Sequence, residues 1–317
     1  MLAAAGGLVL DRMLGEPPVT LHPVVWFGTA MRLVERRCYA PRRTAGVAHA
    51  AIGLALGVAG GEVLGSTVAA TALAAAGRSL RKAARSVAGE LARGELERAR
   101  TLLPALVGRD PTSLDAAEIA RAVVESVAEN TVDAVVGPAL WGALAGAPAA
   151  FGYRAANTMD AMVGHRNPRY ERYGWASARL DDAVSYLPAR LTAALVMAAR
   201  PRRWRAILDA VRHQAPFHPS PNAGVAEAAF AAALGLRLGG TNRYGDRSEV
   251  RPPLGTGRPA AAGDIAAAIR LSSDVEAALL LGLAALGWRR SVRPRRQRAV
   301  RRHAGPWPAH LQPSGSQ

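Results

Sequence analysis

Charged residues recur at every fourth position from Arg121 to Asp133, with Glu125 and Glu129 between them. Residues four apart lie on one face of a helix, where neighbouring like charges cost about 0.2–0.5 kcal/mol per pair. A divalent cation would offset this repulsion, and Mg²⁺ in proteins is held by one or two carboxylates together with substrate phosphates. We therefore predict that Glu125, Glu129 and Asp133 bind Mg²⁺; a solvated acidic helix face is the alternative.

A second polar cluster follows the apolar stretch 134–152. Its members are Asn157, Asp160, His165, Arg166, Asn167, Arg169, Arg179, Asp181 and Asp182. Arginine presents a planar fork of donors that matches phosphate oxygens, whereas anchoring at a membrane surface is the alternative role for each arginine. If 134–152 crosses a membrane once, the two clusters lie on opposite sides. A shared site then requires a partial crossing or a cavity that opens to one face.

The third candidate segment is HPSPNAG at 218–224, directly before an alanine-rich run. Its prolines fix the backbone, and Ser220 or Asn222 can cap the helix that follows. Free N–H groups at such a helix start attract an anion. Ser220 and Asn222 are therefore candidate phosphate ligands, and a rigid helix start is the equally supported alternative.

Several common catalytic motifs are absent from the sequence. The chain has no GxxxxGK[ST], HExxH, GxSxG or CxxC motif, so P-loop, zinc-peptidase and serine-hydrolase chemistry are unsupported. Cys38 is the single cysteine, so neither a disulfide framework nor a cysteine metal cage is expected.

The composition favours a membrane protein over a nucleic-acid-binding protein. Of the 317 residues, 50% are hydrophobic but only 5% are aromatic, and small residues suit the close helix packing of membrane bundles. The net charge is +16, and the arginines gather in blocks beside apolar stretches, as in cytoplasmic loops. A nucleic-acid-binding protein would spread its charge over one face. A genome that favours alanine and arginine codons is the alternative source of these biases.

These patterns predict an all-α fold, a polytopic integral membrane helical bundle with polar helical loops. One membrane-embedded catalytic domain is expected over 1–288, followed by a basic, partly disordered tail at 289–317. A crossing needs about 20 apolar residues. The expected spans lie near 47–76 (a helical hairpin turning near Glu62), 134–152, 183–199, 223–238 and 275–288. For 183–199 and 223–238, buried or interfacial helices are the alternative.

Polar segments connect these stretches. Residues 81–100 alternate charges at helical spacing and are expected to form a solvated helix. Ser113, with Asp115 close behind, marks the start of the helix that carries the acidic residues. Residues 241–259 are rich in glycine and proline and are expected to form an external loop, and 312–317 are expected to be disordered.

Five blocks of sequence occur together in one order. They are GEPPVTLHP (15–23), GRDPTSLDAAEIARAVVESVAENTVDAVVGPALW (108–141), YRAANTMDAMVGHRNPRYERYGWASARLDDAVSYLPARL (153–191), HPSPNAG (218–224) and GGTNRYG (239–245). The ordered set resembles the adenosylcobinamide-phosphate synthases of cobalamin biosynthesis, the CobD/CbiB family, and covers most of the chain. The chain departs from the family pattern at two places. Glu16 stands where aspartate is usual, and Val25-Trp26 stand where an arginine commonly follows the His-Pro-Val of the family.

This resemblance implies a multi-pass inner-membrane enzyme that joins adenosylcobyric acid to aminopropanol phosphate, or to aminopropanol, by an amide bond. ATP would be the co-substrate and Mg²⁺ the cofactor. The implied partners are the corrinoid substrate and the lipid bilayer, with no nucleic acid. Self-association or association with other proteins of the cobalamin pathway would suit this role.

Amide formation of this kind would pass through an acyl phosphate, which needs Mg²⁺ and positive charge near the transferring phosphoryl group. On the matching blocks, Glu125, Glu129 and Asp133 are expected to hold Mg²⁺-ATP, with support from Asn130. The candidate phosphate and substrate ligands are Arg109, Arg121, Arg166, Asn157, Asn167, Ser220 and Asn222. Asp160, Asp181 and Asp182 are candidates for the base that frees the amine, or for a second metal site.

Two other functions fit parts of the pattern. The first is a membrane transferase that uses a diphosphate- or nucleotide-linked substrate, since ENTVD at 129–133 resembles an aspartate-rich motif. The second is a non-enzymatic transporter or scaffold of a membrane pathway, which would tolerate neutralising the acidic residues.

Overall fold

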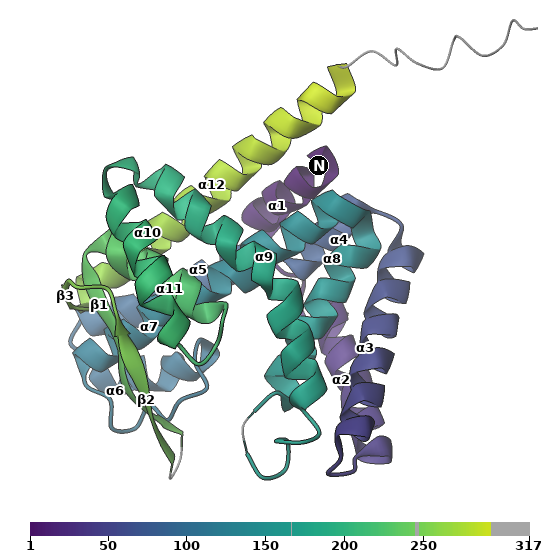
Figure 1. Ribbon diagram of the computed structural model, residues 1–317, viewed down its shortest axis with the longest axis horizontal. Helices are drawn as coiled ribbons and strands as arrows, with labels where there is room; N and C mark the ends of the chain where they lie inside the picture. The colour runs from purple at the N-terminus through teal and green to yellow at the C-terminus, as the bar shows by residue number, and fades with distance from the viewer. Residues whose placement is uncertain (166, 245–246, 293–317) are drawn as a thin grey trace, which may run out of the picture.

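The computed structural model describes residues 1–165, 167–244 and 247–292. Over these ranges the chain is mostly helical, with one small sheet (Figure 1). The longer helices are α1 (Leu2–Leu14), α2 (Pro23–Cys38), α3 (Arg43–Leu64), α4 (Thr67–Ala74), α5 (Gly77–Ala92), α6 (Leu96–Leu102), α7 (Ala116–Thr131), α8 (Gly137–Val163), α9 (Trp175–Ala199), α10 (Trp204–His213), α11 (Ala223–Leu234) and α12 (Ala262–Val292). The strands are β1 (Leu236–Tyr244), β2 (Arg247–Leu254) and β3 (Arg258–Pro259). Of the predicted tail, 293–317 lies outside the described residues.

The helices form two groups, which Figure 1 shows side by side. One group contains α5, α6, α7, α10, α11 and the sheet, and the other contains α2, α3 and much of α8. Helix α9 packs on α8, α11 and α12, and α12 also contacts α1, α5 and α7. These two helices therefore connect the groups.

The apolar stretch 134–152 does not form one straight crossing. A π-helical segment, Val132–Val136, leads into α8, and the backbone leaves helical geometry at Ala145 and Gly146. Beyond this break the chain runs back along itself, because Gly142 lies beside Ala150 and Gly137 lies beside Tyr153. The predicted single crossing is therefore wrong. The stretch is a helical hairpin, and its return places 153–163 on the same side as the end of α7.

Within the described part of the chain, two helical segments are long and apolar enough to cross a membrane: Arg43–Leu64 and the continuous Ala116–Val163, which contains the hairpin. Helix α3 runs past Glu62 and breaks at Gly65, after which the short α4 packs on α1 and α8. The predicted span at 223–238 is wrong. Helix α11 has 12 residues, and 11 of them are buried by protein, so about 18 Å of helix cannot cross about 30 Å of hydrocarbon.

The other predicted spans form parts of longer helices. Residues 183–199 are the second part of α9, and 275–288 lie within the 31-residue α12. Residues 81–100 were expected to form a solvated helix, but they divide between α5 and α6. Within α5, Arg81 is buried and forms an ion pair with Glu276 of α12 at 2.8 Å. This ion pair attaches α5 to α12.

Strands occupy 241–244, 247–254 and 258–259 instead of the expected external loop, so the all-α prediction is wrong for β1, β2 and β3. Strand β1 pairs antiparallel with β2 and parallel with β3, in the order β2-β1-β3. Gly239 has a φ of 86°, and the strand register shifts there. A side chain at Gly239 would collide with the carbonyl oxygen of Pro252, so this bulge needs glycine. Strand β2 is an edge strand, where proline is tolerated.

Glycines on α3 let the return half of α8 approach closely. Gly53, Gly57 and Gly61 lie four residues apart and are buried. A methyl group at Gly57 would lie 2.5 Å from the Cβ of Ala155, and one at Gly61 would lie 2.5 Å from the carbonyl oxygen of Ala147. Small residues at this spacing allow close helix packing. The contact fixes the helix half that carries the polar residues of 153–163.

Helix α7 starts with a capping box. The carboxylate of Asp115 accepts a hydrogen bond from the Glu118 N–H at 2.8 Å, and the Glu118 carboxylate accepts one from the Asp115 N–H at 2.9 Å. Two of the free N–H groups at the helix start are thereby satisfied. The helix predicted from Ser113 and Asp115 is confirmed, and its cap is Asp115.

Candidate active site

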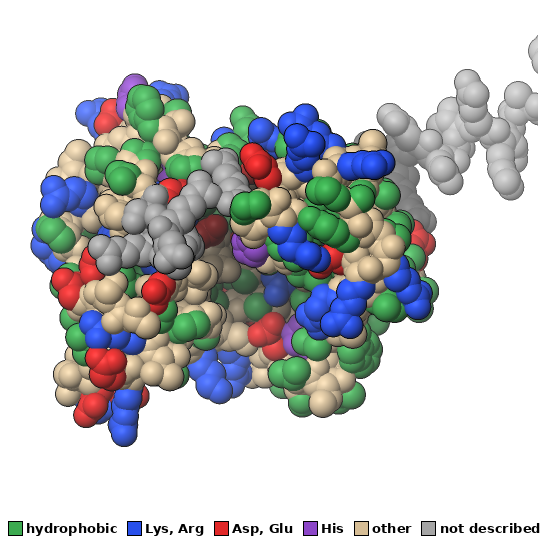
Figure 2. All heavy atoms as spheres, turned by 90° about the horizontal axis from the view of Figure 1, so that it is seen from below, with side chains coloured by type: hydrophobic (Ala, Val, Ile, Leu, Met, Phe, Trp, Pro, Cys, Tyr) green, Lys and Arg blue, Asp and Glu red, His purple; other side chains and the backbone are tan. Residues whose placement is uncertain are grey.

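A deep hollow opens between the two groups of helices. Figure 2 looks into it and shows acidic, basic and histidine side chains gathered in and around it. Residues from the end of α7, from the segment Val132–Val136, from the returning half of α8, from α9 and from the β1–β2 hairpin meet beside this cleft. The helical hairpin within α8 is the reason that the two polar clusters of the sequence share one side of the molecule.

The first group at the cleft is an acidic cluster. The Tyr153 hydroxyl donates a hydrogen bond to Asp133 Oδ1 at 3.2 Å and also contacts the Ser185 hydroxyl at 3.2 Å. The Asn157 amide donates to Asp181 Oδ1 at 3.5 Å. Tyr153 and Asn157 come from the returning half of α8, and Asp181 comes from α9. Three helix segments therefore bring Asp133 and Asp181 together.

Two further aspartates and one glutamate extend this cluster. Asp160 lies one turn beyond Asn157 and is within electrostatic range of Asp182 and Glu129. The pKa of Asp181 is raised well above its ordinary value of 3.8, chiefly by burial and then by the charges of Asp133 and Asp160. A carboxylate in this position is suited to hold a proton or to receive a cation.

Glu129 lies between the acidic cluster and a second group of charges. Its side chain is exposed to solvent although protein atoms surround it densely, as expected for a residue that lines a cleft. It lies within electrostatic range of Arg251, Glu125 and Arg109. Glu129 thus connects the two charged groups.

The second group centres on a buried ion pair. Arg109 donates to Glu125 Oε2 at 2.6 Å, and the Gly239 N–H donates to Glu125 Oε1 at 2.9 Å. Both oxygens of Glu125 therefore have partners from other elements. Metal binding by Glu125 would require one of these contacts to be exchanged.

Removal of Arg109 is expected to destabilise the fold strongly. Arg109→Met leaves the Glu125 carboxylate, 2% exposed, without its nearest cation, and breaking a buried pair costs about 3–5 kcal/mol. The thermal midpoint of the detergent-solubilised protein should fall, by roughly 2 °C per kcal/mol. Arg93→Met breaks an exposed pair and should change it little. Equal midpoints for the two variants would contradict the structural role of Arg109.

Arg121 joins α7 to strand β1. Its guanidinium donates to the carbonyl oxygen of Gly239 and, at 3.1 Å, to that of Thr241.

The segment before α11 also binds its neighbours: Asn222 accepts from Arg190 at 2.7 Å and donates to the Asp182 carbonyl oxygen at 2.8 Å. The Ser220 hydroxyl accepts from the N–H of Ala223 at 3.1 Å. Ser220 thus satisfies an N–H group at the start of α11, whose N-cap residue is Asn222.

A cavity of about 730 Å³ adjoins the acidic cluster at Asp182. Its lining includes His165, Asn167, Trp175 and Arg179. Asn167 also stabilises its own turn, because its side chain accepts from the Tyr170 N–H at 2.9 Å. Arg166, the remaining predicted phosphate ligand, lies outside the described residues.

Comparison with known proteins identifies the family. The family model described as CobD/Cbib protein matches residues 4–272. The chain belongs to this family. Cobalamin biosynthesis protein CobD of Mycobacterium tuberculosis is 45% identical over 299 residues, covering 90% of this chain and 95% of that protein. The CobD protein of Chromobacterium violaceum is 44% identical over 284 residues (83% and 89%), and that of Rhodobacter capsulatus is 41% identical over 309 residues (91% and 97%). No solved structure matches the chain.

Membership of the CobD/CbiB family confirms the resemblance drawn from the ordered blocks and supports a role in cobalamin biosynthesis. The matched range contains α7, α8, α9, α11 and the β1–β2 pair, so it contains both charged groups of the cleft.

The carboxylates of this CobD/CbiB cleft do not form a closed metal cage. Among the described residues, no three His, Cys, Asp or Glu side chains converge closely enough to hold a metal ion. Mg²⁺ needs only one or two protein carboxylates when substrate phosphates complete its shell. The donor chemistry of Glu129 and Asp133, two of the three predicted Mg²⁺ ligands, fits such an open site.

Sequence reasoning missed three members of the second group. His218 Nε2 and Arg251 each lie 3.7 Å from the Glu227 carboxylate, which is fully buried. Burial is the main cause that raises the pKa of Glu227 well above its ordinary value. The sequence signal was the lone Glu227 in an apolar run, and its partners come from a loop and from β2, far apart in the chain.

Proposed function

We propose that this cleft catalyses ATP-dependent amide formation between the carboxyl group of a corrinoid, adenosylcobyric acid, and the amine of aminopropanol phosphate. Family membership supports the pathway and the corrinoid substrate. The observation that carries the proposal is the carboxylate cluster around Asp133, Asn157 and Asp181, which the α8 hairpin assembles beside the Arg109 and Arg251 side of the cleft.

The reaction balances in two steps. The corrinoid carboxylate attacks the γ-phosphorus of ATP, so that a C–O–P bond forms and ADP leaves. The amine then attacks the acyl carbon, the new C–N bond forms, and inorganic phosphate leaves. One proton of the amine passes to a base in the cleft.

The carboxylates of the cleft divide these tasks in our proposal. Asp181 is the base, because its raised pKa lets it accept and hold the proton of the amine. Glu129 and Asp133 would hold Mg²⁺ together with the substrate phosphates, and the ion would neutralise charge on the phosphoryl oxygens. Arg109 positions Glu125 and adds positive charge beside Glu129, and Asp182 faces the larger cavity.

We also propose a multi-pass inner-membrane location. The two apolar helical segments support it, and so do the exposed apolar side chains of α1, α3 and α4, such as Leu10, Val63 and Val68. Self-association and contacts with other cobalamin-pathway proteins remain part of this proposal.

One assay tests the proposed reaction. Membranes that contain the full chain receive ATP, Mg²⁺, adenosylcobyric acid and aminopropanol phosphate, and the corrinoid product is identified by its mass together with ADP release. The expected result is one amide product per ADP. Intact protein that forms no amide, or that releases diphosphate from another donor, contradicts the proposal. Aminopropanol as the second amine shows whether phosphate on the amine is required.

Glu129→Gln is expected to fold normally and to lose product formation by about 100-fold or more, because a metal-binding or charge-balancing carboxylate at the cleft is removed. Glu97→Gln, on the exposed surface of α6, is the matched control. Circular dichroism and the thermal midpoint check the fold. Near-normal turnover by Glu129→Gln would remove this residue from the mechanism.

A further inference from the structure

A smaller cavity of about 270 Å³ lies beside the acidic cluster, between the N-terminal turn, α5, α7 and α8. Its polar lining consists of Glu16, Ser79, Asn130 and Arg154, and the rest is alanine and leucine. Arg154 follows Tyr153 in the chain and donates to Asn157 at 3.4 Å. The cavity is therefore next to the acidic cluster, and the proposed roles of the cleft residues do not use it.

Two opposite charges line this cavity without pairing with each other. Glu16 has His22 as its hydrogen-bond partner, at 3.0 Å, and no ion pair joins Glu16 to Arg154 in the described structure. The Nε atom of Arg154 is buried and has no hydrogen-bond partner. A buried N–H group without an acceptor is unfavourable, so a ligand that supplies one would gain free energy there.

The carboxylate of Glu16 is held in place by His22. The Nδ1 atom of His22 accepts a hydrogen bond from the Val24 N–H at 3.2 Å, so the proton of the neutral ring is on Nε2. Nε2 then donates to Glu16 Oε1 at 3.0 Å. His22 is thus a positioning residue, and Glu16 is fixed as an acceptor at the cavity wall.

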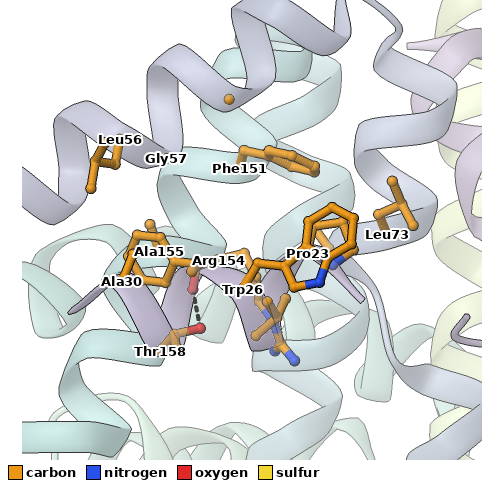
Figure 3. A pocket seen from close by; sticks show the side chains of 14 residues that line it. Pro23, Trp26, Ala30, Leu56, Gly57, Leu73, Phe151, Arg154, Ala155 and Thr158 are labelled. Carbon is orange, nitrogen blue, oxygen red and sulfur yellow. Dashed lines mark hydrogen bonds between the residues drawn. The ribbon is translucent and has the colours of Figure 1, made fainter. Parts of the chain in front are cut away.

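Arg154 lies at the boundary of a second pocket. It lines an apolar pocket of about 300 Å³ together with Trp26, Leu56 and Phe151 (Figure 3). This pocket offers almost no polar lining for an anion. A charged ligand of Arg154 would therefore bind on the side of the polar cavity.

We propose that the cavity between Glu16 and Arg154 is a subsite for a small zwitterion, with the ammonium group on Glu16 and the anionic group on Arg154. This inference rests on the proposed function, in which aminopropanol phosphate is such a molecule, and it concerns the bound state before the amine leaves Glu16 for the acyl carbon. Ser79 and Asn130 provide neutral polar groups in the cavity wall. The alanine and leucine walls leave room for the short carbon chain.

Direct binding to the full-length protein in detergent tests the subsite with three probes. Aminopropanol phosphate carries both charges, propan-2-yl phosphate lacks the amine, and aminopropanol lacks the phosphate. Calorimetry should give the first probe an affinity at least about tenfold above either of the others, since each charged contact contributes separately. Equal affinity for aminopropanol phosphate and propan-2-yl phosphate would overturn the proposal.

Two charge variants assign the ends of the ligand. Glu16→Gln should remove the preference for aminopropanol phosphate over propan-2-yl phosphate, and Arg154→Gln should remove the preference over aminopropanol. Glu97→Gln and Arg93→Gln, both at exposed positions, are the matched controls. Ala83→Leu narrows the cavity without changing a charge, and it should weaken binding of all three probes. Unchanged binding by Glu16→Gln and Ala83→Leu overturns the subsite.

Kinetics separate this inference from the proposed function. If amide formation occurs, Glu16→Gln should raise the KM for the amine by about tenfold and leave the KM for ATP unchanged. An unchanged KM for the amine would reject the subsite and keep the reaction. Selective binding of the zwitterion by a protein that forms no amide would reject the reaction and keep the subsite.

Discussion

Asp181→Asn is expected to lower amide formation by about 100-fold or more and, in the same protein, to raise the thermal midpoint. The loss follows because asparagine cannot accept the proton of the amine, and a positioned base contributes about 10²–10⁴-fold to such a step. The gain follows because the wild-type carboxylate is partly buried among other carboxylates. If Asp181 served the stability of the fold, Asp181→Asn would lower the thermal midpoint instead.

The gain in stability should depend on pH in one direction. The folded-state pKa of Asp181 lies above 3.8, so the folded protein binds this proton more tightly than the unfolded chain does. Above pH 3.8 the unfolded chain releases the proton first, and the wild type loses stability as pH rises towards the folded-state pKa. Asparagine has no such penalty. The advantage of Asp181→Asn should therefore be small near pH 4 and larger at pH 8.

Asp209→Asn on α10 is the control, since Asp209 is exposed and paired with His213 on the same helix. It should change neither product formation nor the midpoint appreciably. Thermal unfolding at several pH values and the mass-based product assay together check both effects. A fall in the midpoint of Asp181→Asn that is independent of pH would show that Asp181 supports the fold and not the reaction.

The helix that carries the acidic residues could be predicted because its signals are local. Asp115 and Glu118 form the capping box, and the apolar periodicity that follows is that of α7. The assembly of the site could not be predicted in this way. The contacts Asp133–Tyr153 and Asn157–Asp181 join residues 20 and 24 positions apart. The first exists because α8 folds back, and the second because α9 packs on the returning half of α8.

The break in α8 has a short sequence signal, Gly146 followed by Pro148, which sequence reasoning did not use. Residues 134–152 have the length and hydropathy of one crossing, and Ala145-Gly146 stands among many other alanines and glycines. Tertiary packing against the glycines of α3 selects the break. The β-hairpin was missed for a related reason: glycine and proline at 239–259 usually indicate a loop, and pairing with neighbouring strands overrides that preference.

The largest effect on the architecture of the site is expected from Gly146→Ala. Gly146 has φ 78° and ψ −160°, a region that is essentially restricted to glycine, and another residue there costs of order 1–3 kcal/mol. A Cβ atom would meet no serious clash, its nearest neighbour being Thr67 Oγ1 at 3.4 Å, so the penalty comes from the backbone. The variant should favour a straighter helix and separate Tyr153 from Asp133.

Gly94→Ala provides a matched control for Gly146→Ala. Gly94 has a φ of 77°, has no atoms within 4 Å of the position that a methyl group would take, and lies between α5 and α6, away from the cleft. Both variants should lose stability, but only Gly146→Ala should also lose amide formation, because only there does the backbone place Tyr153, Asn157 and Asp160. Cysteines placed at Gly142 and Ala150 report the hairpin directly: they should crosslink in the wild-type background and crosslink less in Gly146→Ala. Equal activity of the two glycine variants would mean that the cleft does not depend on the turn at 145–146, and the two polar clusters would then have to meet by another route.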